Sequence, residues 1–193
     1  MSTTQLAGVV SAFALVVYLP EPLGSYLDSF RTSLSGRMTA KAHLTLLPPR
    51  QVRIDPHTAS GHIARTLRQF RPFEVELTSV TRFPKTNVIY LAVGKGSEEA
   101  SRLHEALNRD VLAYDEPFDY IPHVTLFLPP AGAGEAQIAD LQQITGHHWR
   151  KFDQKTRFLV DHLDLVRQSS DGAWQKVSNI PLGFDYDEPE SAA

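Results

Sequence analysis

The sequence has no cysteine among its 193 residues. A disulfide, a catalytic thiolate and a zinc site with cysteine ligands are therefore excluded. Any acid, base or nucleophile must come from histidine, hydroxyl, amine or carboxylate side chains.

Positive charge is also in short supply. The chain has 19 Lys and Arg against 22 Asp and Glu, which gives a formal net charge of −3 and an isoelectric point near 6.2. Binding along the backbone of a long nucleic acid requires a positive field. The composition therefore favours a small or terminal phosphoester partner unless Lys and Arg cluster locally.

No hydrophobic run is long enough to span a bilayer. The longest, residues 6–19, lacks a preceding basic region and a small-residue cleavage site, and its valines suit a buried strand. A hydrophobic content of 42% is enough for one ordinary core. We therefore expect a cytoplasmic, monomeric protein with no membrane partner, folded as a single domain over residues 1–193.

One short pattern occurs twice, eighty positions apart (43 to 123). The two copies are His43-Leu44-Thr45-Leu46 and His123-Val124-Thr125-Leu126, and each apolar run ends in a Pro-Pro pair. A short apolar run that stops at prolines is typical of a β-strand. Because residues i and i+2 share a face of a strand, each His and its Thr point one way and the aliphatic residues point into the core.

Two imidazoles, each beside a hydroxyl, are suited to phosphoester chemistry. One imidazole can take a proton while the other gives one, and the hydroxyls can hold the phosphate oxygens. A single His-x-Thr on a strand is usually only a polar face, whereas two copies in two similar halves indicate function. We predict that His43 and His123 face each other across one cleft, with ring nitrogens roughly 5–8 Å apart.

These residues resemble the motifs of the two-histidine (2H) phosphoesterases, closest to the bacterial 2'-5' RNA ligases or RNA 2',3'-cyclic phosphodiesterases. The resemblance extends to Tyr120-Ile121-Pro122 and to the order of elements over residues 9–183. Where that branch often has a basic residue after the second motif, this chain has Phe127-Leu128-Pro129. The resemblance implies an α+β fold: two similar, interleaved lobes with antiparallel sheets flanked by helices, pseudo-twofold related around a central cleft.

It also implies a metal-independent, cofactor-free phosphodiesterase that hydrolyses 2',3'-cyclic phosphates of RNA ends or nucleotides. The reverse reaction would be 2'-5' RNA ligation. His123 would be the general base and His43 the general acid, with Thr45 and Thr125 binding the phosphate and a bell-shaped pH profile near neutrality. The alternatives are a non-catalytic module that binds nucleotides or RNA ends, and a hydrolase of another small phosphodiester on the same fold.

The local patterns predict the following elements. The strands are expected at 9–19, 42–47, 73–83, 88–93, 123–128, 157–167 and 173–178. The helices are expected at 22–34, 56–70, 97–113 and 135–149. Both ends, 1–6 and 185–193, are expected to be flexible.

Two further groups are candidates for substrate contact. Basic side chains near the first motif could guide a phosphate or be ordinary surface charges: Lys41, Arg50 and Arg53. Aromatic side chains beside the motifs could stack on a base or belong to the core: Tyr18, Tyr120 and Phe127.

The six remaining histidines are given other roles. A metal site could be imagined from His147, His148, His162 and Asp164, but adjacent residues on a helix point about 100° apart, which suits chelation poorly. We therefore predict no metal. The other three are expected to be solvated or, at a helix entrance, to cap it: His62, His104 and His57.

Overall fold

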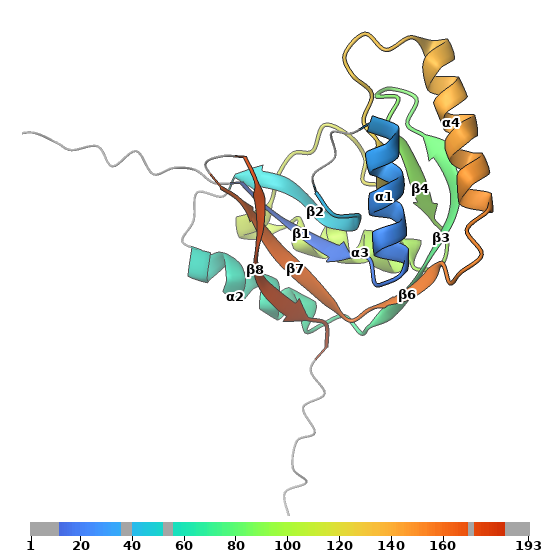
Figure 1. Ribbon diagram of the computed structural model, residues 1–193. Helices are drawn as coiled ribbons and strands as arrows, with labels where there is room; N and C mark the ends of the chain where they lie inside the picture. The colour runs from blue at the N-terminus through green and yellow to red at the C-terminus, as the bar shows by residue number, and fades with distance from the viewer. Residues whose placement is uncertain (1–11, 36–39, 52–55, 170–171, 184–193) are drawn as a thin grey trace, which may run out of the picture.

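The computed structural model describes residues 12–35, 40–51, 56–169 and 172–183, and Figure 1 shows the arrangement of its elements. The strands are β1 (Ala12–Tyr18), β2 (His43–Gln51), β3 (Phe73–Arg82), β4 (Ile89–Val93), β5 (His123–Phe127), β6 (Arg157–Val160), β7 (His162–Gln168) and β8 (Trp174–Pro181). The helices are α1 (Leu23–Ser35), α2 (Pro56–Leu67), α3 (Ser97–Leu107), the short 3-10 helix η1 (Asp110–Leu112) and α4 (Glu135–Arg150).

The strands form two antiparallel sheets. Their orders are β2-β1-β7-β8 and β5-β4-β3-β6, so each sheet carries one motif strand at its edge. The strands β3 and β4 follow the first motif but join the sheet of the second, and β7 and β8 return to the sheet of the first. The predicted α+β fold with two similar lobes is confirmed, and the chain interleaves them.

The helices exchange between the lobes in the same way. Helix α1 connects β1 to β2 yet packs against β5, and α3 connects β4 to β5 yet packs against β2. Helix α4 covers β3, while α2 packs against α3 and β8. Each motif strand therefore packs against the helix that precedes the other motif strand in the sequence.

One continuous core joins the two lobes. The inward residues of the motif strands, Leu44, Leu46, Val124 and Leu126, are all fully buried in it. Full burial of such a side chain is worth about 1.5–3 kcal/mol. The same packing that stabilises the fold therefore holds the two motif strands in place.

Strand β2 does not stop at Pro48-Pro49 as predicted but continues to Gln51. Strand β2 lies at the edge of its sheet. Proline, which has no N–H, is tolerated in an edge strand because the backbone groups on the unpaired side make no hydrogen bonds to another strand. A register shift between the Phe13–Arg50 and Leu15–Leu47 pairs accommodates the prolines.

The predicted strand 157–167 is in fact two strands, because the chain changes sheets at Asp161. Strand β6 pairs with β3 in the second sheet, whereas β7 pairs with β1 in the first. Apolar residues continue on both sides of Asp161, so the sequence pattern alone does not reveal that they belong to two sheets.

Helix α3 ends at Leu107, not at 113. Asn108 leaves the helical conformation (φ −82°, ψ 47°), and its side-chain oxygen accepts the N–H of Tyr114. Helix α2 also ends early, at Leu67. Residues 9–11 of the first predicted strand, Arg53 and both predicted flexible ends lie outside the described residues.

Within the part of the chain that the structure describes, no helix is long and apolar enough to cross a membrane.

Candidate active site

The motif residues lie on adjacent edge strands of the two sheets, and β2 contacts β5. His43 pairs with Tyr18 and Thr45 with Val16 in the first sheet. In the second sheet His123 and Thr125 pair with the β4 residues Ala92 and Tyr90. The histidines and threonines are half-buried while the residues between them are fully buried, which is the alternation that the motif predicts.

Each motif strand carries a β-bulge directly after its threonine. In the first sheet Leu15 pairs with residue 47 and Val16 with residue 45, so residue 46 is extra. In the second sheet Ile89 pairs with residue 127 and Tyr90 with residue 125, so residue 126 is extra. A bulge bends the strand and places two successive side chains on one face. The threonine is therefore the last motif residue to face the site.

The bulge decides the place of Phe127. With residue 126 already buried, Phe127 also turns inward, is only 6% exposed and belongs to the core. Simple alternation would have left it facing the substrate. The proposed substrate contact at Phe127 is therefore corrected to a packing role.

The two histidines make the same hydrogen bond. Nδ1 of His43 donates to the carbonyl oxygen of Lys41, and Nδ1 of His123 donates to that of Ile121, both at 2.6 Å. A carbonyl only accepts, so the proton of the neutral ring is on Nδ1 and the lone pair is on Nε2. Each Nε2 can take a proton when neutral and give one when protonated.

The environment of both rings favours the neutral form. Burial lowers the pKa of His43 and of His123, and the bonds to the carbonyls of Lys41 and Ile121 partly oppose this effect. The charges of Arg31 and His123 lower the pKa of His43 further. The two histidines lie on β2 and β5, which contact each other.

Asp28 and Arg31 of α1 hold the chain that leads into His43. Oδ1 of Asp28 accepts the N–H of Ala42 at 2.6 Å and Nη1 of Arg31 at 3.2 Å. The same Arg31 nitrogen donates to the carbonyl of Ala40 at 3.0 Å. Neither residue was predicted from the sequence. A signal was present, because Arg31 continues the buried face of α1 at helical spacing from Leu23 and Leu27.

Aromatic rings flank both histidines. Tyr18, one of the predicted substrate contacts, lies edge-on to His43 with ring centroids 6.2 Å apart. His123 is flanked by Phe83 at 4.9 Å and Tyr90 at 5.3 Å, and these two rings stack on each other. Phe83 and Tyr90 were not predicted, because only the pairing of β4 with β5 places them beside the second motif.

A groove of about 110 Å³ adjoins His43 and Thr45. Its other lining residues are mostly apolar or aromatic: Ala14, Val16, Tyr18, Ala40, Pro49, Val166 and Trp174. A larger and more open hollow, of about 440 Å³, lies at residues 69–73 with Glu99 and Arg102 and contains no motif residue. Of these two hollows, only the smaller one includes residues of a motif.

The other side chains that were predicted to contact substrate differ in their exposure and in their partners. Lys41 is exposed, whereas Arg50 is only 3% exposed and bound to Glu116, so the guiding role proposed for Arg50 is wrong. Tyr120 donates its hydroxyl to the carbonyl of Thr45, and burial raises its pKa. The residue is half-buried, its ring stacks on His104, and it does not line the groove.

Two predictions about the other histidines also change. His104 is 6% exposed rather than solvated, because α3 turns it toward β2. His62 is half-buried, and the side chain of His57 lies outside the described residues. Asp164 is bound to Lys176 and Asn179. Among the described residues, no three His, Asp or Glu side chains are grouped so as to hold a metal ion.

A family model described as the 2'-5' RNA ligase superfamily matches residues 19–172. The chain belongs to this superfamily. The match spans both motifs and confirms the resemblance to the 2H phosphoesterases on which the sequence analysis relied.

Similar proteins and solved structures agree with this assignment. The chain is 25% identical to "Putative phosphoesterase GK0864" of Geobacillus kaustophilus (strain HTA426), over 89% of this chain and 96% of that protein. It is 28% identical to "Putative phosphoesterase GWCH70_0799" of Geobacillus sp. (strain WCH70), over 77% of this chain and 87% of that protein. E. coli LigT complexed with 3'-AMP has the same fold, with a TM-score of 0.59 at 16% identity over 89% of this chain and 98% of LigT.

Proposed function

We propose that this superfamily member is a metal-independent phosphodiesterase that opens 2',3'-cyclic phosphates of nucleotides or RNA ends. The observation that carries the proposal is the equivalence of His43 and His123. Both leave Nε2 available through the same Nδ1 bond, and they occupy matched positions on two edge strands that contact each other. If these histidines only formed a polar face of each strand, nothing would require both rings to carry the proton on Nδ1.

The reaction needs two proton transfers and no covalent intermediate. By family resemblance, neutral His123 takes a proton from water as its oxygen bonds to phosphorus. The bond from phosphorus to one ribose oxygen breaks, and protonated His43 gives that oxygen its proton. Thr45 and Thr125 donate hydrogen bonds to the non-bridging oxygens as charge develops. The product is a nucleoside monophosphate. If the 5'-hydroxyl of an RNA end takes the place of water and the bond from phosphorus to the 3' oxygen breaks, the same two proton transfers give a 2'-5' linkage.

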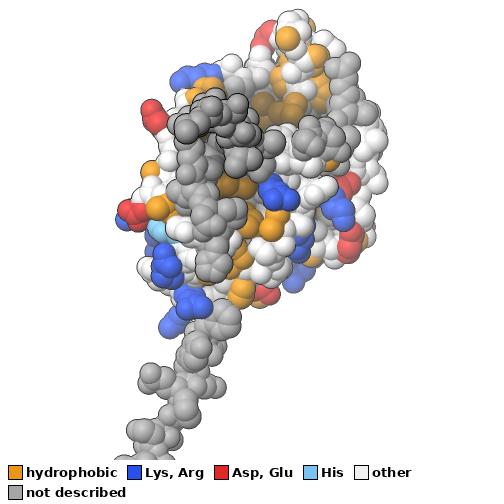
Figure 2. Space-filling model, turned by 90° about the vertical axis from the view of Figure 1, so that its left-hand side faces the viewer, with side chains coloured by type: hydrophobic (Ala, Val, Ile, Leu, Met, Phe, Trp, Pro, Cys, Tyr) orange, Lys and Arg blue, Asp and Glu red, His pale blue; other side chains and the backbone are white. Residues whose placement is uncertain are grey.

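A small nucleotide or an RNA end suits the site better than a long RNA. The groove beside His43 offers apolar and aromatic surface to a base or ribose. Figure 2 shows Lys and Arg side chains scattered among other types on the face it presents, rather than gathered into a basic band. The crystal structures of LigT with 3'-AMP and with ATP support nucleotides as ligands of this fold.

Assays with the four nucleoside 2',3'-cyclic phosphates, with and without EDTA, test the proposal. We expect turnover to a monophosphate that EDTA does not reduce. Loss of turnover in EDTA with recovery in zinc or manganese would show that the histidines are metal ligands. Binding of these compounds without turnover would support the nucleotide-binding module, and turnover of an aryl phosphodiester alone would support a different small substrate.

The pH dependence should reflect the lowered pKa of both histidines. Productive free enzyme needs one neutral and one protonated imidazole, and both pKa values lie below the usual value of about 6.5. We therefore expect kcat/KM to decline above about pH 6.5. The pH optimum of kcat/KM should thus be more acidic than the near-neutral optimum predicted from the motifs alone. A bound phosphate anion raises both pKa values, so the basic limb of kcat should lie at higher pH. Identical basic limbs for the two parameters would contradict this mechanism.

Trp174→Ala should weaken binding of the base without slowing the chemistry. Stacking of a base on an aromatic ring is worth about 1–3 kcal/mol, so KM should rise about fivefold or more while kcat stays within about twofold. The control is Val177→Ala, an exposed residue on the same strand. A cyclic phosphate of methyl riboside, which has no base, should not distinguish Trp174→Ala from wild type. An equal KM effect on that compound would place the base elsewhere.

A further inference from the structure

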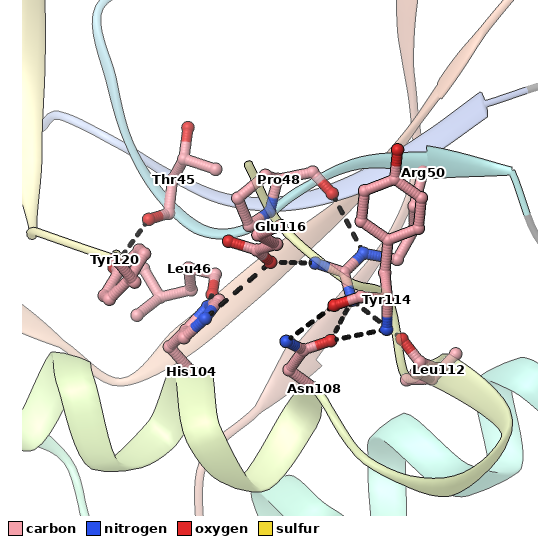
Figure 3. Close-up of polar contacts among 10 residues, drawn as sticks. All are labelled: Thr45, Leu46, Pro48, Arg50, His104, Asn108, Leu112, Tyr114, Glu116 and Tyr120. Atoms are coloured by element: carbon pink, nitrogen blue, oxygen red, sulfur yellow. Dashed lines mark hydrogen bonds and ion pairs between the residues drawn. The ribbon is translucent and has the colours of Figure 1, made fainter. Parts of the chain in front are cut away.

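A buried polar network lies directly behind Thr45, on the side of β2 that faces α3 (Figure 3). Its members are Arg50 from β2, His104 from α3, and Glu116 and Tyr120 from the segment that leads into β5. We call these four residues the Tyr120 network. None of them lines the groove beside His43.

The network binds two successive carbonyl groups of the first motif. The hydroxyl of Tyr120 donates to the carbonyl oxygen of Thr45 at 2.7 Å. Nδ1 of His104 donates to the carbonyl oxygen of Leu46 at 3.0 Å. Leu46 is the extra residue of the bulge, whose backbone is not paired regularly in the ladder. The two donors thus hold the bulge in the conformation that leaves Thr45 facing the site.

The donors are themselves held in place. The rings of His104 and Tyr120 stack with centroids 3.9 Å apart and planes 7° from parallel. Glu116 accepts a hydrogen bond from Arg50 at 2.5 Å and lies 3.7 Å from Nε2 of His104. Arg50 also donates to Asn108 and to the carbonyl of Leu112. Every member therefore has a fixed partner on another element.

A contribution to the stability of the fold does not by itself explain why these polar residues are buried together. A buried ion pair is often no more stabilising than apolar residues of the same shape. This one directs its donors to the backbone of the motif threonine, and Tyr120 stands three positions before His123. It therefore couples the first motif to the chain entering the second motif.

We propose that Tyr120, supported by His104, is a positioning residue that sets the direction of the Thr45 hydroxyl toward the phosphate. The inference rests on the proposed function, since it assigns Thr45 to phosphate binding. Tyr120 does not touch substrate. It acts through the Thr45 carbonyl, and a small displacement of a group that stabilises the transition state is enough to slow the reaction.

The test compares Tyr120→Phe with Tyr114→Phe. The first substitution removes the hydrogen bond to Thr45 but keeps the ring that stacks on His104. The second removes a hydroxyl from the same segment, on a half-exposed tyrosine whose ring lies over Arg50. We expect Tyr120→Phe to lower kcat about three- to tenfold with little change in KM, the usual worth of one hydrogen bond. Tyr114→Phe should leave kcat unchanged.

The same pair of substitutions in a Thr45→Ala background separates positioning from general support of the fold. If Tyr120 acts through the Thr45 hydroxyl, then Tyr120→Phe should have no further effect on kcat once that hydroxyl is gone. An equal loss in both backgrounds would overturn the proposal and assign Tyr120 to fold stability. An unchanged kcat for Tyr120→Phe in the wild-type background would also overturn it.

A readout without turnover distinguishes failure of this inference from failure of the proposed function. In NMR spectra of the full chain, Tyr120→Phe should shift the carbonyl and methyl resonances of Thr45, and Tyr114→Phe should not. Equal shifts in the two variants would reject the positioning role whatever the protein catalyses. A shift at Thr45 in a protein that turns over none of the cyclic phosphates would keep the contact and reject the phosphodiesterase.

His104 is tested by two matched substitutions. His104→Asn keeps an N–H donor near the position of Nδ1 but loses the ring, and His104→Phe keeps the stacked ring but loses the donor. We expect His104→Asn to retain more kcat than His104→Phe, because the Leu46 carbonyl keeps its partner. The reverse order would show that ring packing, not the bond to the bulge, is what the site needs.

Discussion

Replacement of His43 or His123 by alanine should lower kcat by at least about 100-fold, the usual worth of general acid or base catalysis. Each ring supplies one of the two proton transfers, and the bonds at Nδ1 leave only Nε2 to carry it. The effect on KM should be smaller, since Thr45 and Thr125 still bind the phosphate. Steady-state kinetics with the most reactive nucleoside 2',3'-cyclic phosphate provide the measurement.

The double variant His43→Ala/His123→Ala should be little slower than either single variant. Groups that act as a unit in one step give non-additive losses. His147→Ala is the matched control, because His147 is exposed and lies on α4, which packs against β3. Losses that multiplied fully in the double variant, or a loss of similar size in the control, would argue against concerted acid and base roles.

Glu116→Ala should destabilise the fold by about 3–5 kcal/mol, because it leaves the buried charge of Arg50 without its carboxylate. The Arg50 side chain is 1% exposed and that of Glu116 is 12% exposed, so water cannot replace the lost partner. For a chain of this size the loss corresponds to a fall in Tm of about 6–20 °C. Thermal unfolding followed by circular dichroism measures it.

Two comparisons make this prediction specific. Glu74→Gln breaks an ion pair with Lys95 in which the Lys95 side chain is 57% and the Glu74 side chain 35% exposed, and it should change Tm little. Glu116→Gln keeps a hydrogen-bond acceptor for Arg50 and should fall between wild type and Glu116→Ala. A Glu116→Ala protein as stable as the Glu74→Gln protein would mean that the network contributes little to stability.

Local pattern was sufficient for most elements and for the motif residues. His43, Thr45 and their counterparts at 123 and 125 were identifiable because side chains alternate along a strand. The same rule failed at Phe127, where the bulge at Leu126 puts two successive side chains in the core. It also failed at Asp161, where one hydrophobic run leaves one sheet and enters the other.

The sequence by itself determined which side chains are available for chemistry in this protein. The lack of cysteine excludes a thiolate, and the small negative charge and the paired motifs led us to propose two histidines with two threonines acting on a small phosphoester. These are properties of composition and of spacings of two residues, and no fold is needed to interpret them.

Only the tertiary structure decided what surrounds those residues. His104 and Tyr120 bind β2 across separations of 58 and 75 positions, and Asp28 of α1 accepts the N–H of Ala42 across 14 positions. Such contacts exist because α1 and α3 cross to the opposite lobes and the two sheets exchange strands. A one-dimensional pattern records which face a side chain takes on its own element, but not which element lies opposite, because distant segments meet only when the core is packed.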